Sequence, residues 1–370
     1  MRIVMFYQSL ISDWNHGNAH FLRGIAAELL ERGYAVDIYE PANSWSVENL
    51  VREHGYGPLI DFQKAFPQLS STRYELNTLD LDRVLDDADL VLVHEWNEPE
   101  LIDSVGDHAR ESRRLKLLFH DTHHRLASDE RLDFSLANYD GVLAYGAVIT
   151  DRYLRRGWAE RAWTWHEAAD VRVFRPLPAI ERVDDLVWIG NWGDEERTHE
   201  LREFLLEPAK DLRLSGKVHG VRYPREAIDA FFQAGLRYCG WLANYRVPEA
   251  FARARATLHI PRSPYVQALP GIPTIRVFEA LACGVPLICS PWADTDGLFR
   301  SGKDYLLAHN GDDMRAALLD VLNDRGLAAE LAINGLASIL ERHTCAHRVD
   351  ELLAIYRELS STGERHMAVA

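Results

Sequence analysis

The chain has 370 residues, 47% of them hydrophobic, which is enough for two domains of ordinary size. Its formal net charge of −15 argues against non-specific binding to nucleic acid or anionic membranes, because such binding needs a basic surface. The four cysteines, Cys239, Cys283, Cys289 and Cys345, form no CxxC pattern or Cys/His cluster, which disfavours a disulfide scaffold and a zinc site. No run reaches transmembrane length and the first residues lack a secretory pattern, so we expect a cytoplasmic protein.

The first forty residues predict a Rossmann-type unit. Residues 2–8 form a β-rich apolar run, residues 19–32 carry a helical apolar stripe that ends at Gly33, and residues 34–41 form the next strand. The loop before the helix lacks the G-x-G-x-x-G pattern, which disfavours an NAD-type pyrophosphate loop. One interpretation of its polar segment 15–18 is an ordinary turn that caps the helix.

Two later strands end in titratable residues. The pattern ADLVLVH ends in His94 and is followed by Glu95, and LKLLF is followed by His120 and Asp121. Ligands of open parallel sheets bind beyond the carboxyl ends of the strands, so these side chains are candidates for a site. Histidine is the natural general base near neutral pH, and a purely structural histidine is the alternative. Adjacent histidines in segment 120–124 define no ligand geometry, so we predict no metal site.

The pattern changes near the middle of the chain. Pro176 and Pro178 stiffen a segment that is typical of a linker. We therefore predict an N-terminal domain over residues 1–178 and a second domain over residues 179–345. Residues 346–370 then form an amphipathic C-terminal helix with a frayed tail.

The second half restarts the Rossmann pattern. A strand over residues 186–189 leads into a glycine-containing loop with Gly190, Asn191 and Arg197, and then into a helix. Free N–H groups and the helix dipole favour phosphate at such a turn, and a plain turn with a surface arginine is the alternative. Lys217 is either a second cation for phosphate or an ordinary surface lysine.

The segment LPGIPTIRVFEALACGVPLICSPW, residues 269–292, predicts a rigid loop, a short helix, a stop at Gly284 and a buried strand. Arg276 and Glu279 are three residues apart and therefore share one helix face. They are candidates for binding a ligand, and the alternative is a surface ion pair. Earlier in this half, Trp241 and Tyr245 could stack on a base or pack in the core.

RVFEALACGVPLICSPW resembles the donor-site motif of GT-B glycosyltransferases. The IGNWG segment, the HGN segment at residues 16–18 and the ADVRVFRP segment at residues 169–176 resemble the CgeB-like (spore maturation protein) branch, and glycosyltransferase family 4 is more distantly similar. The resemblance implies an α/β protein of GT-B fold. Two Rossmann-like domains face each other across a cleft in that fold, and the C-terminal helix crosses back to the first domain.

The resemblance also implies roles for individual residues. Glu279 would hold the ribose of a nucleotide sugar, while Arg276 and the loop at 190–197 would neutralise its diphosphate. Catalytic roles would fall to His120, Asp121 and His16. The acceptor side would include Asn15, Gly17, His94 and Glu95.

One position departs from family 4, whose earlier glutamate lies eight residues before the position of Glu279. Gly271 stands there in this chain, so the stereochemical outcome stays open.

The resemblance implies a hexose-transferring enzyme that uses a nucleoside-diphosphate sugar, with a UDP-sugar favoured and with no cofactor or bound metal. The acceptor is unidentified and could be a saccharide, a protein, a metabolite or a modified nucleic acid. One alternative is a non-catalytic nucleotide-sugar-binding protein of the same fold. A two-lobed periplasmic binding protein is a third interpretation, which the missing signal pattern disfavours. Oligomeric state is not predicted.

Overall fold

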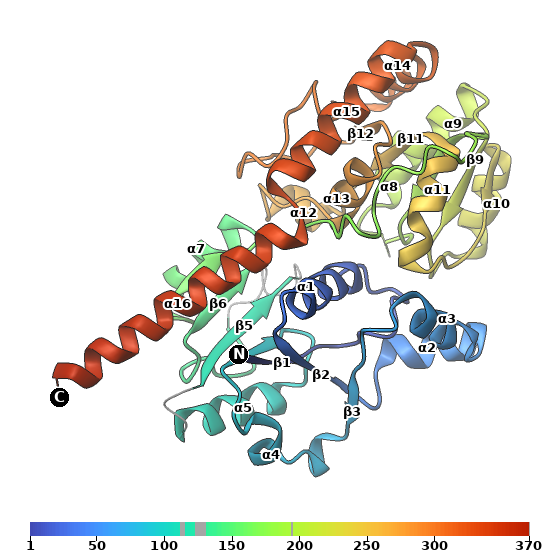
Figure 1. Ribbon diagram of the computed structural model, residues 1–370. Coiled ribbons are helices and arrows are strands. Elements are labelled where there is room, and N and C mark those ends of the chain that lie inside the picture. The colour runs from blue at the N-terminus through green and yellow to red at the C-terminus, as the bar shows by residue number, and fades with distance from the viewer. Residues whose placement is uncertain (112–114, 123–130, 194, 370) are drawn as a thin grey trace. The chain divides into compact units, whose positions relative to one another are not determined.

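Parallel β-strands alternate with helices in two separate sheets in the computed structural model (Figure 1). The structure describes residues 1–111, 115–122, 131–193 and 195–369, with backbone only at 111 and 362–369. The chain divides into a first unit, Met1–Glu167 with Cys345–Ala370, and a second unit, Ala168–Thr344. No helix within the described residues is both long and apolar enough to cross a membrane.

The first unit contains a seven-stranded sheet of order β3-β2-β1-β4-β5-β6-β7, in which all pairings are parallel. Its central strands are apolar runs that are buried on both faces, as parallel sheets require. The strands are β1 Arg2–Phe6, β2 Ala35–Pro41, β3 Thr72–Tyr74, β4 Leu90–His94, β5 Lys116–Asp121, β6 Gly141–Ala144 and β7 Ala162–Thr164. The helices of its described part are α1 Ala19–Glu31, α2 Trp45–His54, α3 Gly57–Ala65, the 3-10 helix η1 Leu76–Thr78, α4 Leu81–Leu85, α5 Pro99–Glu111, α7 Ala147–Arg155 and α16 Cys345–Val369.

Helix α16 closes the first unit although it comes last in the sequence. It packs along α1, where Arg32 forms an ion pair with Asp350, with 2.5 Å between Nη1 and Oδ1. Trp165 donates from Nε1 to the carbonyl oxygen of Arg348 at 2.8 Å. The predicted return of the terminal helix to the first unit is confirmed. The backbone is helical to Val369, and the predicted fraying of the tail stays a prediction.

The second unit contains a six-stranded parallel sheet of order β10-β9-β8-β11-β12-β13. Its main core lies between this sheet and the helical segments from residue 198 to 233 and from 311 to 331. The strands are β8 Asp184–Ile189, β9 Gly216–His219, β10 Leu236–Tyr238, β11 Ala254–His259, β12 Leu287–Cys289 and β13 Leu306–Leu307. The helices are α8 Thr198–Leu201, the π-helical η2 Arg202–Leu206, α9 Glu207–Asp211, α10 Arg225–Gln233, the 3-10 helix η3 Asn244–Arg246, α11 Val247–Arg253, α12 Ser263–Gln267, α13 Ile275–Ala282, α14 Gly311–Asn323 and α15 Arg325–Arg342.

Both sheets have the doubly wound strand order, which starts in the middle and reverses direction once. The reversal lies between β1 and β4 in the first unit and between β8 and β11 in the second. Ligands of such sheets bind at the reversal point, outside the carboxyl ends of the strands. The topology therefore marks one candidate region in each unit.

The units divide after Glu167 and after Thr344, whereas we predicted boundaries after residues 178 and 345. The segment that follows Glu167 pairs inside the second unit, where Ala169 bridges Thr344 and its N–H donates to the carbonyl oxygen of His343 at 2.9 Å. A proline-rich composition indicates a linker, but it does not reveal which unit the flanking backbone joins.

Candidate functional site

In the first unit, two histidines are cross-strand partners at the carboxyl edge of the sheet. His94 on β4 pairs in register with His120 on β5, and their ring centroids are 5.4 Å apart. The sequence therefore correctly predicted that the two strand ends bring titratable groups together. Their catalytic role stays a prediction.

His120 is sealed in the protein interior, with 0% of its surface exposed. Its Nδ1 lies 2.6 Å from the hydroxyl oxygen of Tyr7, and its Nε2 has no hydrogen-bond partner among the described residues. Phe21 and Trp165 also pack against the ring. Burial lowers the pKa of His120 to about 3, so the imidazole is neutral at pH 7.

The remaining predicted groups at this edge are held by their neighbours. The carboxylate of Asp121 accepts a hydrogen bond from the Tyr153 hydroxyl at 2.9 Å. His94 Nε2 lies 2.8 Å from Thr122 Oγ1, and the Thr122 N–H donates to Glu95 Oε1 at 3.2 Å. The chain of contacts from histidine to threonine to carboxylate fixes the orientation of both predicted acceptor-side groups.

The loop after β1 is organised by buried charges. Arg23 forms an ion pair with Asp13 at 2.8 Å and donates from Nε to the carbonyl oxygen of Leu10 at 2.9 Å. The N–H of Leu10 in turn donates to the buried carboxylate of Glu40 at 2.8 Å. This scaffold carries the predicted segment with Asn15, His16 and Gly17.

Within that loop, Asn15 adopts a left-handed conformation with φ 49°. Asparagine tolerates such a conformation better than most residues do. His16 is buried, and its Nε2 lacks a hydrogen-bond partner among the residues the structure describes. Burial and the nearby Arg23 lower the pKa of His16 to about 3.

In the second unit, Arg197 bridges the two loops that leave β8 and β11 at the reversal point. Its Nη1 donates to the carbonyl oxygen of Ile260 at 3.1 Å, and its Nη2 donates to that of Asn191. The guanidinium also lies over the Trp188 ring, with 5.3 Å to the centroid. Burial and Arg262 lower its pKa to about 10, so Arg197 keeps its charge at neutral pH.

The glycine loop before Arg197 packs tightly on that side chain. A Cβ atom at Gly193, which has φ +96°, would lie 2.7 Å from Arg197 Cγ. Gly190 and Asn191 use their carbonyl oxygens inside the protein, for Tyr223 and Arg197 respectively. Helices α8, η2 and α9 follow one another without a break from Thr198 to Asp211, and the amino end of this helical segment directly follows the loop. The phosphate-binding role of the loop stays a prediction.

Glu279 is fully buried on α13 and has partners on both carboxylate oxygens. Its Oε2 pairs with Arg276 Nη1, which confirms the predicted shared helix face. Its Oε1 accepts from Asn244 Nδ2 on η3 at 2.8 Å. The pair is therefore not a surface ion pair, because the carboxylate is fully buried and burial of a charge is costly unless it is paired.

Three predicted donor-side residues have other surroundings. Lys217 forms an ion pair at 2.8 Å with Asp184, the first residue of β8 and hence at the amino edge of the sheet. We leave Lys217 out of the site for this reason. Trp241 and Tyr245 are half-buried in the loop and η3 that follow β10.

Gly271 cannot be replaced by a glutamate without rearrangement. It has φ +91°, and a Cβ atom there would lie 2.3 Å from Oδ1 of Asp296. The departure from family 4 is thus fixed by the backbone of the loop and by Asp296.

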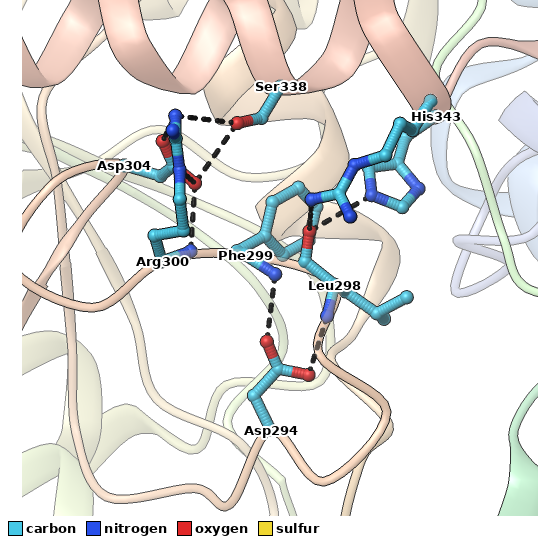
Figure 2. A network of polar contacts seen from close by, with 8 residues as sticks. Asp294, Leu298, Phe299, Arg300, Asp304, Ser338 and His343 are labelled. Carbon is cyan, nitrogen blue, oxygen red and sulfur yellow. Dashed lines mark hydrogen bonds and ion pairs between the residues drawn. The ribbon is translucent and has the colours of Figure 1, made fainter.

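The loop between β12 and β13 is tied to α15 by the network in Figure 2. Asp294 accepts from the N–H groups of Leu298 and Phe299 at 3.0 and 2.8 Å. The buried carboxylate of Asp304 accepts from Arg300 and from the Ser338 hydroxyl, at 2.7 and 3.0 Å. These bonds fix the segment that contacts Gly271.

The sequence analysis missed His259, which ends β11 at the reversal point. Neither ring nitrogen has a hydrogen-bond partner among the described residues, and the side chain is 2% exposed. The signal was available, because the strand pattern RATLH ends in a histidine.

No group of three His, Cys, Asp or Glu side chains among the described residues is arranged to hold a metal ion. His123 and His124, which belong to the segment tested for a metal site, lie outside the described residues, as does Asp194 of the glycine loop.

Residues 197–354 match the family model described as "Glycosyl transferase-like". The matched range begins at Arg197 and includes His259, Arg276 and Glu279. A search of curated proteins found no match.

The whole chain is similar in structure to solved glycosyltransferases. Sucrose-phosphate synthase from Thermosynechococcus elongatus has a TM-score of 0.66 at 14% identity, over 98% of this chain and 100% of that one. The chain has the GT-B glycosyltransferase fold. Anabaena HepE, solved with UDP and glucose, scores 0.65 at 15% identity, over 97% and 100% of the two chains. An α-glucosyltransferase solved with UDP-glucose and DNA containing an abasic site scores 0.69 at 14% identity, over 96% and 99%.

Proposed function

We propose that the protein transfers a hexose from a nucleoside-diphosphate sugar, with UDP as the favoured nucleotide, to an acceptor that is still to be identified. One observation carries this proposal: the buried Arg197 and His259 lie at the sheet reversal of the second unit, inside the segment that matches the glycosyltransferase-like model, which also contains the buried Glu279. The UDP preference draws on HepE and the α-glucosyltransferase, whose structures contain UDP or UDP-glucose. The IGNWG and RVFEALACG segments support the CgeB-like branch.

In this proposal the second unit binds the donor. Arg197 and Arg276 supply positive charge for the diphosphate, which would let leaving-group departure proceed without a bound metal. The ribose hydroxyls donate to the carboxylate of Glu279, which Asn244 and Arg276 orient. Because Glu279 has no exposed surface in this structure, ribose binding requires one of these partners to move aside.

We assign the acceptor-side hydrogen-bonding role to His16, whose imidazole is neutral at pH 7, and give His120 a positioning role. His120 is enclosed by aromatic rings and bonded to Tyr7, so it cannot touch a substrate in this arrangement. His16 lies in the loop at the sheet reversal of the first unit, and its Nε2 lacks a partner within the described part of the chain. Asp121 keeps Tyr153 in place beside this edge.

A non-catalytic nucleotide-sugar-binding protein is the second candidate. The sealed position of His120 favours it, because the predicted catalytic group has no path to a substrate in this structure. The two candidates share the donor site and differ only in turnover.

The first experiment measures the melting temperature with a panel of nucleoside diphosphates and nucleotide sugars, with and without magnesium, because ligands of the native state raise it. We expect a selective shift with a UDP-sugar that Glu279→Ala abolishes. The matched control is Glu249→Ala, which removes an exposed glutamate paired with Arg246 in the same unit. No shift with any nucleotide would contradict the proposal.

The second experiment measures hydrolysis of the bound donor. Wild-type turnover that His16→Gln lowers at least tenfold, with unchanged donor affinity, supports the enzyme. Tight donor binding without any hydrolysis or transfer supports the binding protein instead.

A further inference from the structure

His259 is placed where the strand order predicts a ligand. It is the last residue of β11, which pairs with β8 at the reversal point of the second sheet. Its side chain is 2% exposed, and both ring nitrogens lack a partner among the described residues. A neutral imidazole has one N–H donor and one acceptor, and buried groups of this kind are nearly always bonded. The imidazole of His259 therefore needs a hydrogen-bond partner that the described residues do not supply, and a bound ligand can provide one.

The surroundings of His259 favour an anion as that group. Arg197 is held by the carbonyl oxygen of Ile260, the residue next to His259, and its charge acts on the imidazole. The Nε–H of Arg197 is buried and has no acceptor within the described residues. Two unsatisfied donors, one of them charged, thus lie on adjacent loops.

Aromatic rings pack against these two side chains, and the acidic neighbour Glu196 is itself paired with Arg262 at 2.7 Å. Trp188 packs under the Arg197 guanidinium, and Trp292 lies edge-on to His259 with 5.9 Å between ring centroids. In such a dry setting, hydrogen bonds to a charged oxygen are stronger than in water. An inorganic or ester phosphate oxygen fits this chemistry, because it accepts from two donors at once.

We propose that His259 is a donor-binding residue that, together with Nε of Arg197, binds a diphosphate oxygen of the nucleotide sugar. This inference rests on the proposed function. On this view, the unbonded imidazole of His259 lowers the stability of the free protein and is retained because it binds the ligand.

The decisive comparison uses His259→Leu, which removes both nitrogens and keeps an apolar side chain of similar size. Because no described residue bonds to the imidazole, the melting temperature of the free variant should equal or exceed that of wild type. Titration calorimetry should show that its affinity for UDP falls at least tenfold, while its affinity for uridine changes less than twofold. His259→Gln, which restores a donor, should recover part of the UDP affinity.

His219→Leu is the matched control, because His219 ends the neighbouring strand β9 and also has an unpartnered buried nitrogen, Nδ1, among the described residues. Its UDP affinity should stay within twofold of wild type. Equal UDP binding by His259→Leu and wild type would overturn the inference and leave the proposed function intact. A lower melting temperature of free His259→Leu, with UDP and uridine affinities reduced alike, would overturn it in favour of a structural role. Wild-type protein that binds neither UDP nor any UDP-sugar would instead refute the proposed function itself.

Discussion

The two sheets have the same doubly wound topology, but the histidines at their carboxyl edges differ in their hydrogen-bond partners. In the first unit, Nδ1 of His120 has the Tyr7 hydroxyl at 2.6 Å, its Nε2 has no partner among the described residues, and aromatic rings enclose the side chain. In the second unit, His259 is equally buried, but neither of its nitrogens has a partner among the described residues. The comparison teaches that topology marks a region for ligands. Within it, a histidine that bonds to its own chain through one nitrogen is held as scaffold, and a histidine with neither nitrogen bonded is a candidate binding residue.

The largest effect is expected from Arg197→Lys. Lysine cannot bond the carbonyl oxygens of Asn191 and Ile260 together or stack on Trp188 in the same way. We expect the free energy of unfolding to fall by about 2–3 kcal/mol and UDP affinity to fall at least tenfold. Urea denaturation and calorimetry measure the two quantities.

Arg255→Lys is the control for this change. Arg255 also bonds a carbonyl oxygen, that of Leu322, but it lies near the amino end of β11. This variant should lose some stability and keep wild-type UDP affinity. A loss of affinity as large as that of Arg197→Lys would show that the effect is general destabilisation.

Acid should destabilise both units through their buried histidines. Burial lowers the pKa values of His16, His120 and His259 to about 3, below the ordinary value of 6.5. The unfolded chain then binds more protons than the folded one between these values, so the stabilising contribution is complete above pH 6.5 and is lost as the pH falls towards 3. Each histidine contributes a slope of up to about 1.4 kcal/mol per pH unit in that window.

Urea denaturation between pH 7.5 and 4.5 measures this slope. His259→Leu should reduce the slope of the free energy of unfolding with pH by the contribution of one histidine. Replacement of the exposed His309 by leucine should leave this slope unchanged. A slope that His259→Leu leaves unaltered would mean that this imidazole titrates normally.

Tyr7→Phe should produce the opposite result to His259→Leu. It removes the hydroxyl beside Nδ1 of His120 and leaves that buried nitrogen without its partner. We expect a loss of about 1–2 kcal/mol in the free energy of unfolding, with no change in UDP affinity. Tyr34→Phe, at a less buried tyrosine of the same unit, is the control. If Tyr7→Phe left the free energy of unfolding unchanged, the hydrogen bond between Tyr7 and His120 would not distinguish His120 from His259 energetically.

The smallest effect is expected from Lys217→Met. The ion pair with Asp184 is partly exposed, with 23% and 16% of the two side chains accessible, so its loss should cost less than about 1 kcal/mol. UDP affinity should not change, because this pair lies at the amino edge of the sheet. A tenfold loss of affinity would restore Lys217 to the donor site.

The sequence by itself determined the features that depend on local periodicity. Alternating apolar strands, helical stripes and glycine stops predicted the α/β architecture, and three-residue spacing placed Arg276 beside Glu279. The position of strand ends also predicted that His94 and His120 lie together. These properties can be predicted because they depend on residues that are neighbours in the chain, or because they follow from a general rule of parallel sheets.

Only the tertiary structure decided which side chains are buried and which have hydrogen-bond or ion-pair partners. Arg197 and Ile260 are 63 residues apart and meet because the strand order places β8 beside β11. The same packing pairs Lys217 with Asp184, joins Asn244 to Glu279 and seals His120 behind aromatic rings. Burial and hydrogen-bond partners are properties of the assembled chain, because they depend on contacts that no local pattern encodes.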